Sequence, residues 1–229
     1  MLFRSGKDNT RQQSAMWQAM LMAAGIEPSE KIVVNGFVLG GDGRKMSKSI
    51  GNVIDPLDVI ETYGAETLRY VVCREISPFE DSPVDMERIH NAYTAHLVNG
   101  LGNLVSRIMN MAETHLDGPV EVPHGTIPEP LRDALNSFQL QAAADIVWEK
   151  VAELDLRIQS EKPFQVVKED TARAQEMIKT LVVDLYAIGE MIRALMPETS
   201  TQIKELVEEN KKPAEPLFPR IDRISSSSD

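Results

Sequence analysis

The sequence predicts an α/β segment followed by an all-α domain, and three features of its 229 residues indicate this order. Near the start, an amphipathic helical stretch precedes a β-branched run and a glycine-rich turn, which are typical of a parallel α/β sheet. From residue 84 onward the pattern changes to long amphipathic helices separated by prolines. An apolar content of 42% is ample for a buried core. We therefore expect the closing part of a parallel sheet, a small linker and an antiparallel α-helical bundle.

The α/β segment is predicted to contain a helix over residues 10–24 and a strand over residues 32–39. Asp8 and Asn9 can cap the helix, and Gly25 ends it. The apolar stripe of this helix consists of Met16, Trp17, Met20 and Leu21. The first residues differ from a buried strand, because Arg4-Ser5 is polar where a sheet interior is apolar.

Next, a short helix up to residue 63 and a second compact element are predicted to form a small α/β linker, and long helices follow. Two short elements over residues 55–63 and 65–74 are separated by a glycine. The longer helices are expected over residues 84–116, 129–160, 164–196 and 199–209, with prolines at their boundaries. Beyond residue 211, a proline-rich stretch and four consecutive serines predict a tail that buries little.

Composition excludes several classes of protein. A formal net charge of −11 argues against coating nucleic acid by general electrostatics, although local patches can still bind tRNA. The single cysteine, Cys73, excludes an internal disulfide and a cysteine-cluster metal site, and the scattered histidines show no metal-ligand spacing. No apolar run approaches the roughly 20 residues that span a bilayer, and the start lacks a secretory signal. We expect a cytoplasmic protein with no membrane partner.

A short basic motif, Lys45-Met46-Ser47-Lys48-Ser49, follows the predicted strand and its turn. Two ammonium groups three residues apart on such a loop can reach a triphosphate and stabilise charge that develops in a transition state. The alternative for the two lysines alone is a solvated basic loop.

Together with residues 51–56, this motif resembles the second signature of class I aminoacyl-tRNA synthetases, whose loop closes over ATP during amino-acid activation. The strings at residues 6–9, 74–83 and 97–107 are similar to methionyl-tRNA synthetases, whereas leucyl and valyl enzymes share only the stretch 43–69. The resemblance covers about residues 6–209. It implies a remnant of a Rossmann-like catalytic domain, a stem-contact linker, an anticodon-binding bundle and a disordered tail, at residues 1–52, 53–83, 84–212 and 213–229.

The resemblance also implies a site for ATP, which enters as a substrate with Mg²⁺. Gly6 and Asp8 match residues that contact the ribose, and Val38 lies where backbone groups meet adenine. Lys48 matches the lysine that grips the phosphates, with Lys45 supporting it. The alternative for Asp8 is a plain helix cap.

For the methionine pocket, Trp17 matches an aromatic residue of the family. Many members have an aromatic residue followed by histidine where this chain has Gln12-Gln13. Two amides could bind the polar groups of the amino acid. The alternatives are a core position for the tryptophan and solvated helix positions for the glutamines.

In the helical part, Asn103 and Arg107 match the anticodon readers of the family and lie one helical turn apart. Phe164, after Pro163, stands where the family usually has tryptophan and keeps a face for stacking on a base. The alternative for this polar pair is a solvated stripe on a bundle helix. Trp148 is expected in the bundle core.

The resemblance implies a methionine–tRNA ligase that acts on methionine, ATP and tRNA(Met), of which this chain is expected to be a part. The sequence contains no HIGH-type motif, so we expect the missing N-terminal half of the catalytic domain upstream and an inactive isolated chain. The alternatives are a stand-alone tRNA-binding module and a synthetase for another aliphatic amino acid. Residues 2–5 can also be back-translated as the end of a common sequencing adaptor, which predicts that the natural chain is cut off upstream of Gly6.

Overall fold

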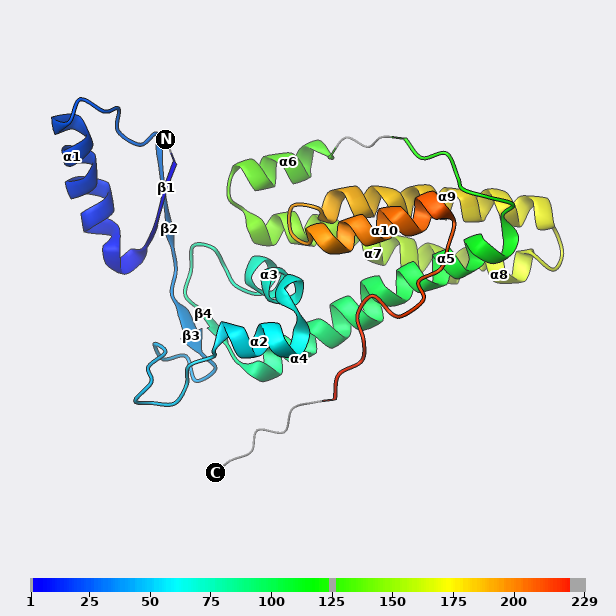
Figure 1. The fold of residues 1–229 in the computed structure, drawn as a ribbon, viewed down its shortest axis with the longest axis horizontal. Helices are drawn as coiled ribbons and strands as arrows, with labels where there is room; N and C mark the ends of the chain where they lie inside the picture. Colours follow the sequence, from blue (N-terminus) through cyan, green and yellow to red (C-terminus); the bar gives the residue numbers. More distant parts are fainter. Residues whose placement is uncertain (1, 124–126, 223–229) are drawn as a thin grey trace. The chain divides into compact units, whose positions relative to one another are not determined.

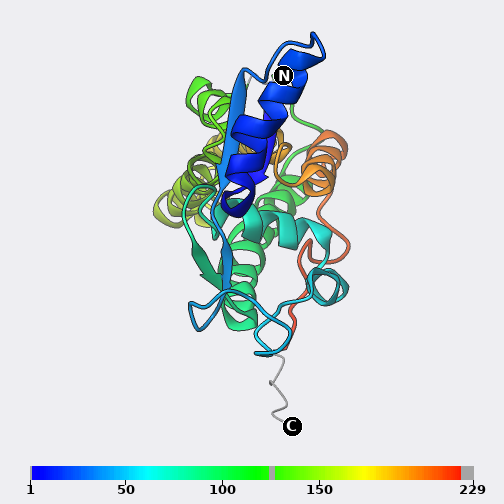
Figure 2. The ribbon, with the colours of Figure 1, turned by 90° about the vertical axis from the view of Figure 1, so that its left-hand side faces the viewer.

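The computed structural model describes residues 2–123 and 127–222, which form two compact units (Figures 1 and 2). The α/β unit contains the described residues up to Asp55 together with Ile76–Met86. The helical unit contains Pro56–Glu75 and the described residues from Glu87 onward. The protein is therefore a mixed α/β chain that is mostly helical, as predicted.

The α/β unit begins with a strand–helix–strand arrangement. Strands β1 (Leu2–Gly6) and β2 (Lys31–Asn35) pair in parallel. The chain between them contains a 3₁₀ turn, a π-helical stretch and helix α1, over Lys7–Asn9, Gln12–Met16 and Trp17–Ala23. Residues 2–6 form a strand although Arg4-Ser5 is polar, because backbone groups form the ladder whatever the side chains are.

The strand predicted over residues 32–39 is divided in two. β3 (Val38–Gly40) pairs in parallel with β4 (Ser82–Val84) and not with β1. Between the two parts, the Phe37 N–H donates to the Asp81 carboxylate at 2.8 Å. The chain passes so close at Gly36 that a Cβ there would lie 2.2 Å from the Glu80 carbonyl oxygen. The strand thus changes partner at this point.

Helices α2 (Pro56–Tyr63) and α3 (Ala65–Arg74) agree with the two short predicted elements. They are joined at Gly64, whose φ of 86° suits glycine. Helix α3 packs against helices of the helical unit. Residues 53–83, expected to form one linker, are therefore shared between the two units.

The longer helices differ from prediction in their breaks. Residues 86–115 are helical throughout, as α4 (Met86–Ala92), a π-helical stretch (Tyr93–Gly102) and α5 (Asn103–His115). The predicted helix 129–160 is broken at Phe138, which has a φ of 59°, and the predicted helix 164–196 is broken at residues 167–170. The other helices are α6 (Glu129–Asn136), α7 (Leu140–Glu161), α8 (Pro163–Val166), α9 (Thr171–Ile192) and α10 (Pro197–Glu209). Within the described ranges, none is both long and apolar enough to cross a bilayer.

The core of the helical unit lies around α9, which packs against α5, α7 and α10 (Figure 1). Leu101, Val105 and Leu181 are completely buried there. The chain after α10 also packs on this unit, because the Phe218 side chain is buried and the Tyr93 hydroxyl donates to the Pro219 carbonyl at 2.6 Å. Residues 213–222 thus differ from the predicted tail, and residues 223–229 lie outside the described residues.

Candidate functional site

The Lys45–Ser49 loop of the α/β unit is tied to the end of β3. Lys45 forms an antiparallel bridge with Leu39. The Gly40 N–H donates to the Arg44 carbonyl at 2.9 Å, and Gly43 turns the chain with a φ of 73°. The loop therefore starts from a fixed strand end.

Two side chains brace the loop from within. The Asp42 carboxylate accepts the Arg44 backbone N–H at 3.0 Å, and this bond is the main cause that lowers the pKa of Asp42. The Asn52 amide donates to Asp42 at 3.2 Å, and its oxygen accepts the Ser47 N–H at 2.8 Å. It also donates to the Lys45 carbonyl at 3.5 Å. These bonds hold Lys45 and Ser47 of the motif to one side chain.

Lys45 and Lys7 share one aromatic ring. Their ammonium groups lie 4.7 and 4.6 Å from the centroid of the Phe37 ring. Lys7 also forms an ion pair with Asp81 at 2.5 Å. The Lys7 ammonium, with the Phe37 N–H as a second donor, holds the pKa of Asp81 below its ordinary value. The basic loop is thereby placed beside the residues that follow β1.

The five predicted ATP residues all lie in the α/β unit. Gly6 ends β1, where parallel strands commonly bind ligands, and a Cβ there would lie 2.9 Å from an Asp8 carboxylate oxygen. Val38 starts β3 and is 43% exposed. Lys48 is exposed and has no ion-pair partner among residues 2–123 and 127–222. The structure brings Gly6 and Asp8 close to each other and places Lys45 next to their neighbour Lys7, whereas Lys48 lies farther along the loop.

The predicted methionine-pocket residues lie on one helical run of the same unit. The Trp17 N–H donates to the Gln12 carbonyl across a wide π turn, so the two residues occupy successive turns of one face. Gln12 is exposed, whereas Gln13 and Trp17 are half-buried. The Gln13 carbonyl accepts the Gln18 side-chain amide at 2.9 Å. A pocket role for these residues stays a prediction.

In the helical unit, Asn103 and Arg107 are both exposed and line one groove of about 370 Å³. Arg107 forms an ion pair with Asp155 of α7, a partner that spacing along the sequence could not indicate. Phe164 on α8 is 46% exposed, which keeps its ring available for stacking. The structure thus brings Asn103 and Arg107 together, and their role as readers stays a prediction.

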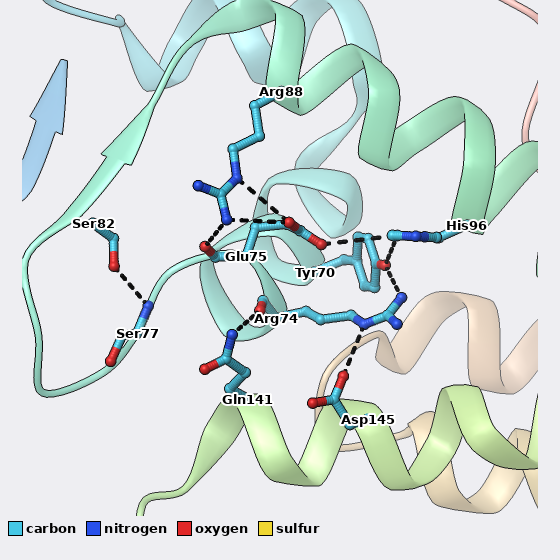
Figure 3. A network of polar contacts seen from close by, with 9 residues as sticks. All are labelled: Tyr70, Arg74, Glu75, Ser77, Ser82, Arg88, His96, Gln141 and Asp145. Carbon is cyan, nitrogen blue, oxygen red and sulfur yellow. Dashed lines mark hydrogen bonds and ion pairs between the residues drawn. The ribbon is translucent and has the colours of Figure 1, made fainter. Parts of the chain in front are cut away.

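A polar network that the sequence did not indicate joins α3, α7 and the 86–115 helical run of the helical unit (Figure 3). The Tyr70 hydroxyl lies 2.6 Å from His96 Nδ1 and accepts Arg74 Nη1 at 2.7 Å. Arg74 also pairs with Asp145 at 3.2 Å. The network consists of Tyr70, Arg74, Glu75, Arg88, His96, Gln141 and Asp145.

Burial changes the pKa of a member of this network, Tyr70. It also encloses a neighbouring tryptophan, Trp148. Burial raises the pKa of the Tyr70 hydroxyl, although the Arg74 guanidinium opposes the shift. Trp148 stacks 4.5 Å from Tyr70 and is buried, so its predicted place in the core is confirmed. The network links helices far apart in the sequence. Among the described residues, no group of three or more histidine, cysteine or acidic side chains could hold a metal ion.

Comparisons with known proteins agree in pointing to one family. Residues 3–109 match the family model described as tRNA synthetases class I (M). A methionine–tRNA ligase of Brucella suis is 30% identical over 215 residues, covering 88% of this chain and 42% of the relative. One from Caldanaerobacter subterraneus is 29% identical over 251 residues, covering 95% of this chain and 39% of the relative. A solved structure of Mycobacterium tuberculosis methionyl-tRNA synthetase in complex with methionyl-adenylate has a TM-score of 0.79 at 27% identity, covering 96% of this chain and 50% of that one. The chain thus spans about half, or less, of these relatives.

Proposed function

Because this chain belongs to the methionyl-tRNA synthetase family, we propose that it is the part of a methionine–tRNA ligase that carries the phosphate loop and the anticodon-binding helices. The completed enzyme would activate methionine with ATP to methionyl-adenylate and transfer it to tRNA(Met). The chain covers 42% of the Brucella relative, so this activity is proposed for the completed protein and not for the isolated chain.

The observation that carries the proposal is the anchored basic loop beside the end of β1. Lys45 and Lys7 share the Phe37 ring, next to Gly6 and Asp8. In activation, a methionine carboxylate oxygen bonds to the α-phosphorus of ATP, and the bond from that phosphorus to the leaving pyrophosphate breaks. Ammonium groups held close to the phosphates stabilise the charge that develops, and Mg²⁺ enters with ATP as substrate. Lys48, exposed on the loop, is the proposed main phosphate contact.

The helical unit is proposed to bind the anticodon of tRNA(Met). Asn103 and Arg107 line one groove and can address base edges, while the exposed Phe164 ring offers a stacking face. We accordingly propose a Rossmann-like catalytic remnant over residues 1–52, a stem-contact linker over 53–83 and an antiparallel helical bundle over 84–212. A cytoplasmic location is proposed as well.

The direct test is methionine-dependent exchange of pyrophosphate into ATP, measured on the isolated chain and on a protein completed with an N-terminal half from a related enzyme. We expect exchange only in the completed protein. Exchange by the isolated chain would contradict the expected dependence on the missing half. Leucine- or valine-dependent exchange would favour a synthetase for another aliphatic amino acid. Binding of tRNA without exchange by the completed protein would favour a stand-alone binding module.

A further inference from the structure

The groove that contains Asn103 and Arg107 has a second wall, which the chain supplies after α10. On the α5 side, the lining residues are polar and recur on successive turns: Asn103, Ser106, Arg107 and Asn110. The opposite wall is formed by residues 212–216, with Lys212 at one end and Pro216 at the other. The groove thus lies between a helix and a stretch of irregular chain in the same compact unit.

This second wall is anchored at both ends. Asn210 takes up the left-handed conformation, with a φ of 51°, and the Lys211 N–H donates to the Leu206 carbonyl at 3.0 Å. Lys212 forms an ion pair with Glu113 of α5 at 3.3 Å. Farther along, the buried Phe218 ring packs edge-on against Tyr93. The segment is therefore held against the helix and does not hang free.

The two walls offer groups that suit a nucleotide of single-stranded RNA, beside one acidic residue, Glu215. Pro213 and Pro216 offer apolar surface for a base, and the Asn103 amide and the Arg107 guanidinium offer groups for its edge. The Lys212 side chain is 54% exposed, and an exposed pair such as that with Glu113 is weak enough to exchange for a phosphate.

We propose that residues 212–216 close a nucleotide site against α5, in which Lys212 contacts the phosphate of the bound anticodon nucleotide. The inference rests on the proposed function, since it adds residues to the surface assigned to the anticodon. The ligand is one unstacked nucleotide of an RNA loop.

The first test compares two adjacent lysines in the full chain. Lys212 lines both this groove and a neighbouring depression, whereas Lys211 pairs with Glu209 at 2.7 Å and lines the neighbouring depression but not this groove. Binding would be measured for a CAU stem-loop and one with a changed first base, at several salt concentrations. We expect Lys212→Ala to weaken both RNAs to a similar extent and to reduce the salt slope by about 1, whereas Lys211→Ala leaves both unchanged. Equal behaviour of the two variants would overturn the assignment of Lys212.

The second test fills the groove. Ala214→Trp places a large ring in the wall, and it should lower the preference for CAU about tenfold, the scale of one lost base contact. Ala172→Trp, on an exposed position of α9, is the matched control and should retain the preference. If Ala214→Trp retained the preference for CAU, residues 212–216 would not form part of the nucleotide site.

These measurements distinguish an error in the proposed anticodon binding from an error in the proposed role of residues 212–216. If the unmodified chain binds both stem-loops alike, the proposed anticodon function itself is wrong. If the chain prefers CAU and Arg107→Ala removes that preference, while Lys212→Ala and Ala214→Trp match their controls, only the second wall is wrong.

Discussion

The two units differ in how they hold their candidate sites. Among the side chains described in the α/β unit, at residues 6–55 and 76–86, the buried apolar ones are Leu21, Val33 and Val84. Helix α1 exposes apolar side chains instead, at Met16 (58%), Met20 (61%) and Met22 (66%). The helical unit buries apolar side chains from every long helix. The phosphate loop is therefore held mainly by polar bonds, and the α5 groove by a packed core.

If the α/β unit activates methionine and the helical unit selects the RNA, a variant in one unit should impair the function of that unit and leave the function of the other unchanged. In the completed protein, Lys48→Ala should reduce pyrophosphate exchange by about 10²–10³-fold, the scale for losing one charge-stabilising donor. Lys45→Ala should cost less, because the Lys45 ammonium already lies against Phe37. Exchange rates and binding of the CAU stem-loop would be measured on the same samples. Wild-type exchange by Lys48→Ala would show that the loop is structural.

Replacing matched core leucines tests the difference in packing. Leu101 is completely buried in the helical unit, so Leu101→Ala should destabilise that unit by roughly 3 kcal/mol, within the usual range for such truncations. Leu21→Ala should cost less, because exposed neighbours on α1 leave little packing to lose. Urea unfolding can follow each unit separately, since Trp17 lies in the α/β unit and Trp148 in the helical unit. Single-tryptophan proteins with the other replaced by phenylalanine would report the two transitions. Equal losses from both leucines would contradict the comparison.

For the selection of RNA, Arg107→Ala should remove the preference for the CAU stem-loop, at roughly 1–3 kcal/mol per lost base contact. Arg132 on the helix surface provides the control, and Arg132→Ala should change the binding of both RNAs little and equally. Equilibrium binding at two salt concentrations separates base contacts from phosphate attraction. Identical results for the two arginine variants would show that Asn103 and Arg107 belong to a solvated helix face and do not read the anticodon.

The smallest expected effect concerns pH and the helical unit alone. His96 faces Tyr70 and Glu75, and burial, helped by Arg74, lowers its pKa below 6.5 (Figure 3). As the pH falls below 6.5, the unfolded chain therefore takes up a proton on this histidine before the folded chain does, and stability decreases until the folded pKa is reached. Glu75 and, to a lesser extent, Asp145 favour protonation of His96 and limit this lowering of its pKa.

Urea unfolding at pH 7.5 and 5.5, followed through Trp148, would measure this loss. His96→Gln should lose less stability over the interval than the unmodified chain. An equal or larger loss in the variant would assign the pH dependence to other groups.

Local signals predicted part of this structure, and distant contacts decided the rest. Helix α2 and the bounds of α3 could be predicted because Pro56 and Gly64 set their ends through nearby backbone geometry. The strand break at Phe37 depends on Asp81, far along the chain, and the break at Phe138 places a bulky residue at positive φ. The residues of the phosphate loop could be identified from a short motif. Its supports and the partners of α5 are brought together only by folding.

The wide turns over Tyr93–Gly102 set the rotational phase of the helix that follows them. A π turn contains more residues than the 3.6 of an α-helix, so adding or removing one residue rotates every later side chain by about 100°. Asn103 begins the first regular turn after this stretch, and Arg107 follows one turn later. An insertion or deletion between residues 93 and 102 would therefore rotate α5 about its own axis. Both side chains would turn away from their groove, although the sequence around them would be unchanged.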